Sequence, residues 1–345
     1  MEKRIILKGM NESDLQQYCV DLNQPKFHGS QLYRWMYKNN CADIDSMNNI
    51  PKMLKKEIKK NAVLNLLSIK TQSKSEIDNT TKFLLETHDS KYIETVSMID
   101  NDRHTICLSS QIGCSVDCDF CATGKMGITR NLSTGEIIDQ LIIIKEKINK
   151  PITNIVFMGM GEPFLNYNNL IRSCEILTNH NAFNLSSKRI TISTSGILPK
   201  IDLYIKENHK YKLAISLNAS NNDFRDKIMP INKKWNIEKI ITSVKKYKFF
   251  DSRPIMFEYV LLKGLNDSKE DAIRLANILK GIKCKVNLIP FNEIKGYYKR
   301  PNKDQINYFS QTLNDSNPHL RVLIRWSKGE DINAACGQLA TINES

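Results

Sequence analysis

The chain has 345 residues, of which 41% are hydrophobic, enough for one large domain or for a core with a smaller accessory domain. Lys and Arg number 50 against 37 Asp and Glu, and the net charge of +13 is typical of a nucleic-acid-binding protein or of a soluble protein with a basic surface. The first residues lack the apolar run of a secretory signal, and no segment approaches the roughly 20 apolar residues of a membrane span. We therefore expect a cytoplasmic protein without membrane contact.

Residues 1–70 predict a small helical accessory domain. Helical patterns cover 11–22, with an N-cap and an acidic first turn, and then 29–39 and 50–60. In the last stretch, five lysines at spacings of three and four share one helical face: Lys52, Lys55, Lys56, Lys59 and Lys60. That face is either a solvated surface or an RNA-contacting patch, and the pattern favours neither.

Residues 71–100 predict a β-hairpin-like connection, because turn residues separate two apolar runs within 81–99. From residue 101 onward, strand patterns alternate with helical ones, which predicts an α/β fold with a parallel sheet, open or closed into a barrel. The strand patterns cover 104–110, 152–160, 189–196, 211–219, 255–262, 284–291 and 320–326. The helical patterns cover 133–148, 168–179, 236–247 and 268–282. Polar and glycine-bearing stretches follow several strands, where parallel α/β folds place their chemistry.

Three cysteines stand together in "CSVDCDFCATG": Cys114, Cys118 and Cys121. Because thiols stay reduced in the cytoplasm, they predict metal ligands or catalytic groups rather than disulfides. A structural zinc site needs a fourth ligand, for which His104 and Cys107 are nearest, and no second C-x-x-C pair supplies one. An iron–sulfur cluster agrees better with this pattern, since thiolates are its usual ligands and an iron without a protein ligand can bind a substrate or cofactor.

The stretch "FMGMGEPFLN" follows a predicted strand. Gly159 and Gly161 let a backbone approach a ligand closely, and Glu162 can accept a hydrogen bond from an ammonium group. A turn followed by a surface carboxylate would give the same pattern, so this stretch alone does not decide between the two interpretations.

The C-x3-C-x2-C spacing, with Phe120 before the last cysteine, resembles the radical S-adenosylmethionine (SAM) superfamily. Seven stretches together resemble its RlmN family of RNA adenine-C2 methyltransferases: "TICLSSQIGC", "GMGEPFLNY", "ITISTSG", "MPINKKWNIE", "FEYVLLKGLND", "KVNLIPFN" and "GEDINAACGQL". The resemblance covers nearly the whole chain. It implies a partial (β/α)6 barrel over residues 101–345 with a C-terminal catalytic cysteine, preceded by a short β extension at 71–100 and a helical RNA-binding domain at 1–70.

The resemblance implies one 4Fe–4S cluster per chain, held by Cys114, Cys118 and Cys121, with SAM on the fourth iron and two SAM molecules used per turnover. The family's SAM-binding positions fall on Gly161, Glu162, Ser193, Ser216, Leu217, Asn218 and Asn292. Asn218 departs from the family pattern, which has histidine there. Asparagine can hydrogen-bond a hydroxyl or carboxylate, but it cannot carry a proton.

The resemblance also implies catalytic roles for Cys336, Cys107 and Glu94. Cys336 would accept a methyl group from a first SAM, and a 5′-deoxyadenosyl radical from a second would abstract hydrogen from it, so that the carbon radical adds to adenine C2. Glu94 would remove the C2 proton, and Cys107 would attack the Cys336 sulfur, releasing the RNA and leaving a transient disulfide. Without the resemblance, both cysteines would be interpreted as small structural residues and Glu94 as a surface carboxylate.

The implied RNA partners are large-subunit ribosomal RNA at the peptidyl-transferase centre and certain transfer RNAs at the adenosine 3′ of the anticodon. A low-potential electron donor such as flavodoxin or ferredoxin is also implied, and a monomer is expected. Four cysteines match no motif and are expected to be structural: Cys19, Cys41, Cys174 and Cys284.

Three alternatives remain at this point. The sister Cfr family methylates carbon 8 of the same adenine, but it tends to have alanine where this chain has Pro163 and a different residue before the glycine of "STSG". A non-catalytic zinc module could bind RNA through the basic surface. A radical SAM enzyme acting on a peptide or metabolite would leave Cys107 and Cys336 without a role.

Overall fold

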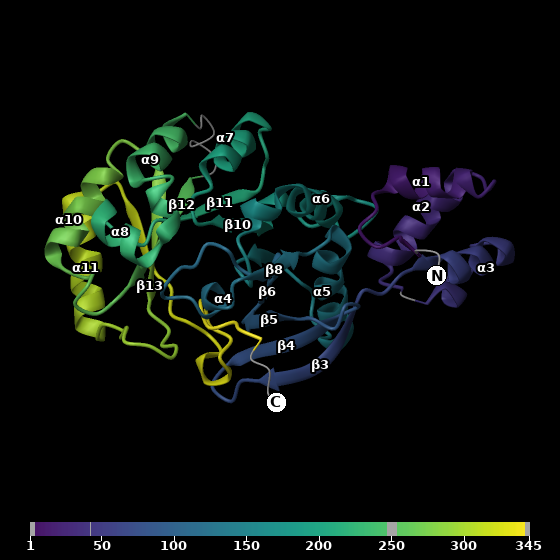
Figure 1. Cartoon of the computed structure of the whole chain (residues 1–345), viewed down its shortest axis with the longest axis horizontal. Helices are drawn as coiled ribbons and strands as arrows, with labels where there is room; N and C mark the ends of the chain where they lie inside the picture. Colours follow the sequence, from purple (N-terminus) through teal and green to yellow (C-terminus); the bar gives the residue numbers. More distant parts are fainter. Residues whose placement is uncertain (1–3, 42, 247–253, 342–345) are drawn as a thin grey trace.

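A mixed sheet of ten strands forms the centre of the molecule, in a computed structural model that describes residues 4–41, 43–246 and 254–341 (Figure 1). The strand order is β14-β13-β12-β11-β10-β9-β6-β5-β4-β3. Neighbours from β6 to β14 in this order are parallel. These parallel strands are β6 (Arg103–Cys107), β9 (Asn154–Phe157), β10 (Ile190–Thr194), β11 (Lys212–Ser216), β12 (Ile255–Leu261), β13 (Cys284–Pro290) and β14 (Arg321–Ile324). All seven strand patterns in the sequence therefore form strands of one parallel sheet.

Three antiparallel strands extend the sheet beyond β6: β5 (Tyr92–Asp100), β4 (Asn79–Thr87) and β3 (Leu67–Lys74). Strands β4 and β5 form the predicted hairpin. The sequence does not indicate β3, because most of its side chains are polar and exposed and no apolar alternation marks it. Since β3 begins at Leu67, the expected domain boundary at residue 70 falls inside a strand.

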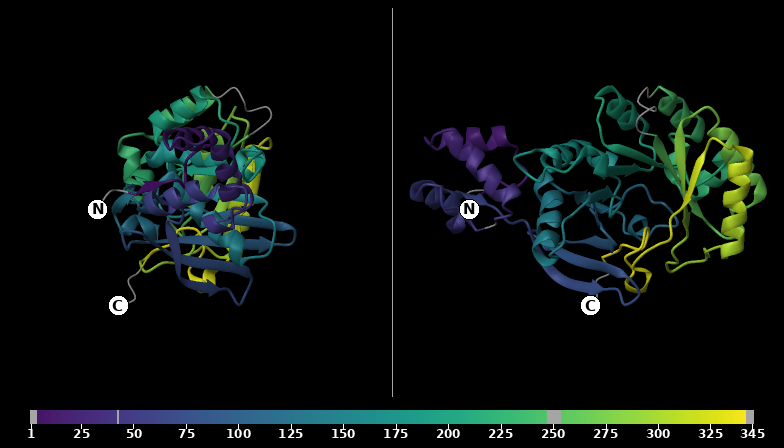
Figure 2. Two further views of the ribbon diagram at one scale, coloured as in Figure 1. Left: turned by 90° about the vertical axis from the view of Figure 1, so that its right-hand side faces the viewer. Right: turned by 180° about the vertical axis from the view of Figure 1, so that it is seen from behind.

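Helices cover the outer face of the parallel strands (Figure 2). They are α5 (Thr134–Lys147), α6 (Tyr167–Thr178), α7 (Leu198–Lys206), α8 (Asn222–Ile228), α9 (Ile237–Lys245), α10 (Lys269–Ile278) and α11 (Lys303–Ser316). The four predicted helical stretches form α5, α6, α9 and α10. The sequence analysis does not predict α7, α8 or α11: α8 has 7 residues, and α11 buries only Ile306, Phe309 and Leu313 in an otherwise polar stretch.

The N-terminal helices lie together at one end of the molecule, away from α10 and α11 (Figure 1). They are α1 (Glu12–Asp21), α2 (Phe27–Tyr33) and α3 (Lys52–Asn61), in the three predicted stretches. An ion pair joins this part to the barrel: Lys8 Nζ lies 3.1 Å from Asp139 Oδ1 on α5, with both side chains buried. Two small sheets complete the strands, β1 (Ile5–Ile6) with β2 (Ala62–Val63) and β7 (Gln111–Gly113) with β8 (Ile128–Asn131).

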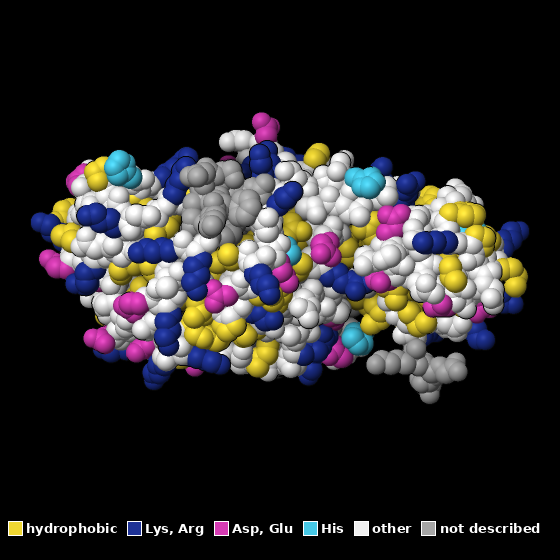
Figure 3. All heavy atoms as spheres, turned by 90° about the horizontal axis from the view of Figure 1, so that it is seen from above, with side chains coloured by type: hydrophobic (Ala, Val, Ile, Leu, Met, Phe, Trp, Pro, Cys, Tyr) yellow, Lys and Arg dark blue, Asp and Glu magenta, His cyan; other side chains and the backbone are white. Residues whose placement is uncertain are grey.

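The predicted fold class, an α/β partial barrel with a helical N-terminal part, is confirmed. The (β/α)6 plan does not include β14, although the strand pattern at 320–326 predicts it. The edge strand β3 and the short strands β1, β2, β7 and β8 are not predicted from the sequence. Across the described ranges, every helix is too short or too polar to traverse a lipid bilayer. Lys and Arg side chains are spread over the face seen in Figure 3 rather than gathered into one patch.

Candidate active site

The three cysteines of the C-x3-C-x2-C motif lie on a loop between β7 (Gln111–Gly113) and helix α4 (Ala122–Lys125). Gly113 turns the chain into this loop with φ +77°, and a Cβ there would collide with the carbonyl oxygen of Gly127. The same carbonyl accepts a hydrogen bond from the backbone N–H of Cys114 at 2.7 Å. The turn therefore needs glycine at position 113, and this turn fixes the position of the Cys114 backbone.

All three cysteines line a cavity of about 140 Å³ at the carboxyl ends of the parallel strands, here named the upper cavity. Three thiols at one cavity are the usual protein ligands of a 4Fe–4S cluster that keeps one iron open to a substrate or cofactor. Burial raises the pKa of each thiol, that of Cys114 to about 12, so three thiolates need a cationic group between them.

The two residues expected as the nearest fourth zinc ligands, His104 and Cys107, lie away from the three cysteines. The His104 ring is buried, with Nε2 at 2.8 Å from Ser97 Oγ and Nδ1 at 3.1 Å from the carbonyl oxygen of Lys150. Cys107 lines a different cavity. Neither residue belongs to the described lining of the upper cavity.

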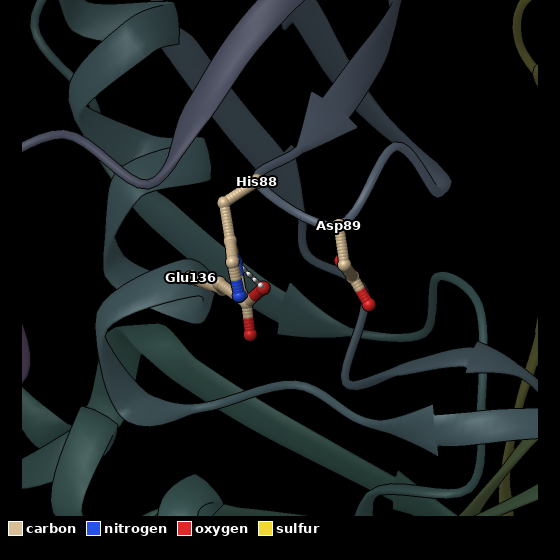
Figure 4. A group of neighbouring side chains, drawn as sticks. All are labelled: His88, Asp89 and Glu136. Carbon is tan, nitrogen blue, oxygen red and sulfur yellow. Dashed lines mark ion pairs between the residues drawn. The ribbon is translucent and has the colours of Figure 1, made fainter. Parts of the chain in front are cut away.

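A second group of possible metal ligands lies where the β4–β5 turn meets helix α5: His88, Asp89 and Glu136 (Figure 4). Arg130 already pairs with both carboxylates, since its Nη2 donates to Asp89 at 2.7 Å and to Glu136 at 2.8 Å. Glu136 also completes the capping box of α5 with Ser133. Because a guanidinium group neutralises these carboxylates, the group is a structural ion-pair network and we assign no metal to it.

Six of the seven residues predicted to contact SAM line the upper cavity: Gly161, Glu162, Ser193, Ser216, Asn218 and Asn292. Leu217 is the exception within the described lining, because it is fully buried and its N–H donates to the carbonyl oxygen of Glu258 at 3.0 Å. The expected contact between Leu217 and SAM stays a prediction.

Glu162 is fixed before any ligand arrives. Its carboxylate accepts hydrogen bonds from the N–H groups of Ser195 at 2.7 Å and Phe164 at 2.9 Å. Burial raises the pKa of this carboxyl group, while these hydrogen bonds lower it. The residue before it, Gly161, has φ +96°, and its Cα packs so closely on Gln111 that a Cβ would not fit. Gly161 thus lets the backbone pass close to Gln111 and place Glu162 in the cavity.

The two asparagines of the upper cavity are held by backbone groups. Asn218 has φ +57°, a left-handed conformation that asparagine adopts more readily than most residues, and its Oδ1 accepts from the N–H of Val260 at 3.0 Å. Its polar side chain is therefore engaged with β12. Asn292 donates from Nδ2 to the carbonyl oxygen of Cys336 at 2.9 Å, which ties the end of β13 to the C-terminal cysteine.

A second cavity of about 440 Å³ extends toward the beginnings of β6, β10 and β12 and is named the lower cavity. Cys107 and Cys336 both line it. The two cavities share five lining residues: Met158, Glu258, Ile289, Cys336 and Leu339. Burial raises the pKa of Cys107 to about 11, a shift that Arg325 opposes. Cys336 is exposed and lines both cavities. The two outlying thiols therefore face one space, and Cys336 also reaches the space beside the three loop cysteines.

The C-terminal segment, residues 329–340, carries Cys336 across the barrel. At its start, Asp331 accepts from the hydroxyl of Ser75 at 2.8 Å, next to the β3–β4 turn. Near its end, Gly337 accepts from the N–H of Ala122 at 2.7 Å, at the beginning of α4. The segment thus bridges the antiparallel strands and the cysteine loop.

Glu94 contacts the end of the C-terminal segment. Its Oε1 is 2.9 Å from Lys82 Nζ, and its Oε2 accepts from the N–H of Ala340 at 2.9 Å. Burial raises its pKa, an effect that Lys82 opposes. Glu94 is outside the described lining of both cavities. The structure therefore brings the cysteines and the six SAM-contact candidates together, but it does not bring Glu94 to them.

Comparison with known proteins identifies the family. The model described as "Ribosomal RNA large subunit methyltransferase N-terminal domain" matches residues 5–64, and that described as "Radical SAM superfamily" matches 108–276. A dual-specificity RNA methyltransferase RlmN of Vesicomyosocius okutanii is 42% identical over 346 residues, covering 99% of this chain and 96% of the relative. One of Anaeromyxobacter is 40% identical over 348 residues, covering 98% and 91%. The chain belongs to the RlmN family.

A solved structure agrees with this RlmN assignment. The crystal structure of a radical SAM methyltransferase from Sphaerobacter thermophilus superposes with a TM-score of 0.92 at 38% identity, covering 97% of this chain and 99% of that one. As an RlmN-family member, the chain is a radical SAM RNA methyltransferase, and its superfamily implies a 4Fe–4S cluster and SAM.

Three residues of this RlmN-family chain are not predicted from its sequence: Glu258 and Arg325, which line the cavities, and Arg225, which lies outside their described lining. Glu258 is a lone acidic residue in the apolar stretch "IMFEYVLL", a signal that could have revealed it. Arg225 is fully buried and donates to the carbonyl oxygens of Ser195 and Leu217 at 2.8 and 2.9 Å, but no local pattern marks it. Arg325 gives no signal either, because its neighbours come from distant strands.

Proposed function

We propose that this chain methylates carbon 2 of adenosine in large-subunit ribosomal RNA, and also the adenosine 3′ of the anticodon in some transfer RNAs. Cys336 would carry the methyl group and Cys107 would release the product. The observation that supports this most strongly is the shared lining of the lower cavity by these two thiols. A radical SAM enzyme for a peptide or metabolite would have no use for such a pair.

The chemistry explains the need for a thiol carrier. The methyl carbon of SAM is an electrophile, and carbon 2 of adenine, between two ring nitrogens, is electron-poor as well. Direct polar transfer between them is unfavourable, whereas a carbon radical can add to the ring. A 4Fe–4S cluster held by Cys114, Cys118 and Cys121 supplies, with SAM, the radical chemistry for that step.

The protein's own residues perform the steps before and after the radical step. Cys336 takes up a methyl group as a thioether. That group loses one hydrogen atom, and its carbon then bonds to C2 of the base, which leaves one unpaired electron on the adduct. This electron must pass to a one-electron acceptor once the C2 proton has left, a role that the cluster would supply. Glu94 takes the C2 proton, which requires the end of the C-terminal segment to move away from its carboxylate. The Cys107 thiolate then attacks the Cys336 sulfur and breaks its bond to carbon. The released carbon takes up a proton to become the methyl group, and the disulfide must be reduced before the next turnover.

The helical N-terminal part, up to about residue 70, would contact the RNA backbone. Helix α3 buries Leu54 and Ile58 and leaves Lys52, Lys56 and Lys59 exposed. Lysines on an exposed helical face suit phosphate contacts that position RNA without reading its sequence. Charge spread over a wide surface would support such contacts with a folded RNA (Figure 3).

Mass spectrometry of digested RNA tests the proposal. The reconstituted protein is incubated anaerobically with SAM, a reductant and transcripts of the ribosomal and transfer RNA targets, and nucleosides are separated against authentic standards. We expect 2-methyladenosine as the product.

The C336A variant is the matched control, and it should form no methylated nucleoside while keeping its iron. The proposal is contradicted if 8-methyladenosine is the main product, or if C336A methylates RNA at the wild-type rate.

A further inference from the structure

A buried carboxylate, Glu258 of β12, lies in the wall between the upper and lower cavities. Only 4% of its surface is exposed. Its Oε2 accepts hydrogen bonds from the hydroxyls of Ser193 on β10 at 2.7 Å and Ser216 on β11 at 3.3 Å. Two neighbouring strands thus fix one oxygen of this carboxylate in the barrel wall.

The other oxygen, Oε1, is buried and has no hydrogen-bond donor among the residues that the structure describes. Arg325 balances part of the charge, but its Nη1 is 3.9 Å away, beyond hydrogen-bond distance, and donates instead to Met158 Sδ at 3.3 Å. Buried polar atoms are rarely left unpaired, because they have lost their water without gaining a partner. Oε1 is therefore suited to a donor that a ligand brings.

The neighbour that matters is Cys336, which lines the same two cavities as Glu258. A base that becomes bonded to the Cys336 methyl carbon must lie against this shared wall. Adenine offers one kind of N–H donor there, its 6-amino group, since its remaining base-edge nitrogens are acceptors.

We propose that Glu258 Oε1 accepts a hydrogen bond from the 6-amino group of the target adenine and thereby selects adenine over purines with a 6-keto group. This inference rests on the proposed function, because it takes adenosine in RNA as the substrate. A 6-keto purine would place a second acceptor against the carboxylate and leave both unpaired. A site built in this way rejects such an analogue strongly.

A glutamine at this position predicts a change in selectivity. The E258Q side chain keeps the size and an accepting oxygen, but its amide N–H can also donate to a 6-keto oxygen. The variant should therefore tolerate both purines, whereas wild type should prefer adenine.

The experiment measures kcat/KM for RNA with adenosine or inosine at the target position. We expect the adenosine-to-inosine ratio to fall about tenfold or more in E258Q relative to wild type. The matched control is E86Q, which removes a half-buried carboxylate on β4 near Lys70 and should leave the ratio unchanged. Comparing ratios cancels the intrinsic difference in reactivity between the two bases.

Affinity for SAM is measured in the same variants by equilibrium binding, because SAM also carries an adenine. Glu258 holds the hydroxyls of Ser193 and Ser216, two of the SAM-contact candidates, so E258Q can weaken SAM binding as well. The inference predicts that the adenosine-to-inosine ratio falls whether or not this affinity changes. A lower SAM affinity with an unchanged ratio would overturn the inference and assign Glu258 to SAM, and an unchanged ratio with unchanged affinity would overturn it too.

If E258Q does not fold, E258D provides the test. It keeps the charge but withdraws the carboxylate from the cavities, so the ratio should again fall, and an unaltered ratio in folded E258D contradicts the inference. If wild type modifies neither RNA, it is the proposed function that fails.

Discussion

Cys107 differs from an ordinary core cysteine in the cation near it. Burial raises the pKa of Cys174 without an opposing positive group, and this thiol packs in the core as a small apolar residue. Burial also raises the pKa of Cys107, but Arg325 opposes the shift. A thiol that must act as a nucleophile needs such compensation, because the thiolate is the reactive form.

Replacing Cys107 with alanine should stop the reaction after the carbon bond has formed. Cys336 would then hold the RNA through the methylene carbon, because no thiol remains to attack its sulfur. We expect a covalent RNA–protein band on denaturing gels and less than one product per chain. The C284A variant, which changes a buried cysteine outside the cavities, should turn over normally. Multiple turnover by C107A would remove Cys107 from the mechanism.

Arg325→Gln should shift the pH dependence of RNA release. Losing the guanidinium raises the pKa of Cys107 further, so the thiolate forms only at higher pH and release moves to higher pH, by about one unit or less. The measurement is the single-turnover rate at which the adduct disappears between pH 7 and 10. An exposed arginine variant, R189Q, serves as control. Identical profiles for R325Q and wild type would show that Arg325 does not act on this thiol.

At the scale of elements, the C-terminal segment decides where Cys336 lies. It is held by the β3–β4 turn at one end and by α4 and Glu94 at the other. These hydrogen bonds connect parts of the chain that are remote in sequence. Glu94 therefore has two possible roles, as an anchor for this segment and as a base.

E94Q separates these two roles. The glutamine carbonyl can still accept from the Ala340 N–H, so the anchor is kept, but the amide cannot take up a proton. If Glu94 is the base, the rate of methylation should fall about 100-fold or more while thermal stability is nearly unchanged. K82M is the control for the lost ion pair with Lys82. Methylation by E94Q at the rate of K82M would leave Glu94 an anchor only.

Whether a feature depends on local sequence or on contacts between remote residues decides whether the sequence could predict it. Cys114, Cys118 and Cys121 were recognisable because their spacing is local, and the strands and long helices because their apolar patterns are local too. The hydrogen bond from the Ala340 N–H to Glu94 forms because the C-terminal segment folds back onto β5. The hydrogen bond from Ser193 to Glu258 depends on the order of the strands in the sheet. No local pattern records such contacts, and the polar edge strand β3 was missed for a similar reason.

At the scale of the whole molecule, basic side chains lie both on the N-terminal helices and at the lower cavity, which Arg103, Arg325 and Lys328 line. The N-terminal helices lie at the end of the molecule opposite α10 and α11 (Figures 1 and 2). Lysines there can hold an RNA at a distance from Cys336, which explains how positioning and chemistry can be divided between parts of one chain. The buried Lys8–Asp139 ion pair joins the N-terminal part to helix α5.

The most direct test of the account replaces Cys114, Cys118 and Cys121 together with alanine and assays RNA methylation by nucleoside mass spectrometry after anaerobic reconstitution. The account predicts loss of bound iron and no 2-methyladenosine, while C41A, a change outside every motif and both cavities, keeps both. Methylation of adenine at the wild-type rate by the triple variant would contradict it.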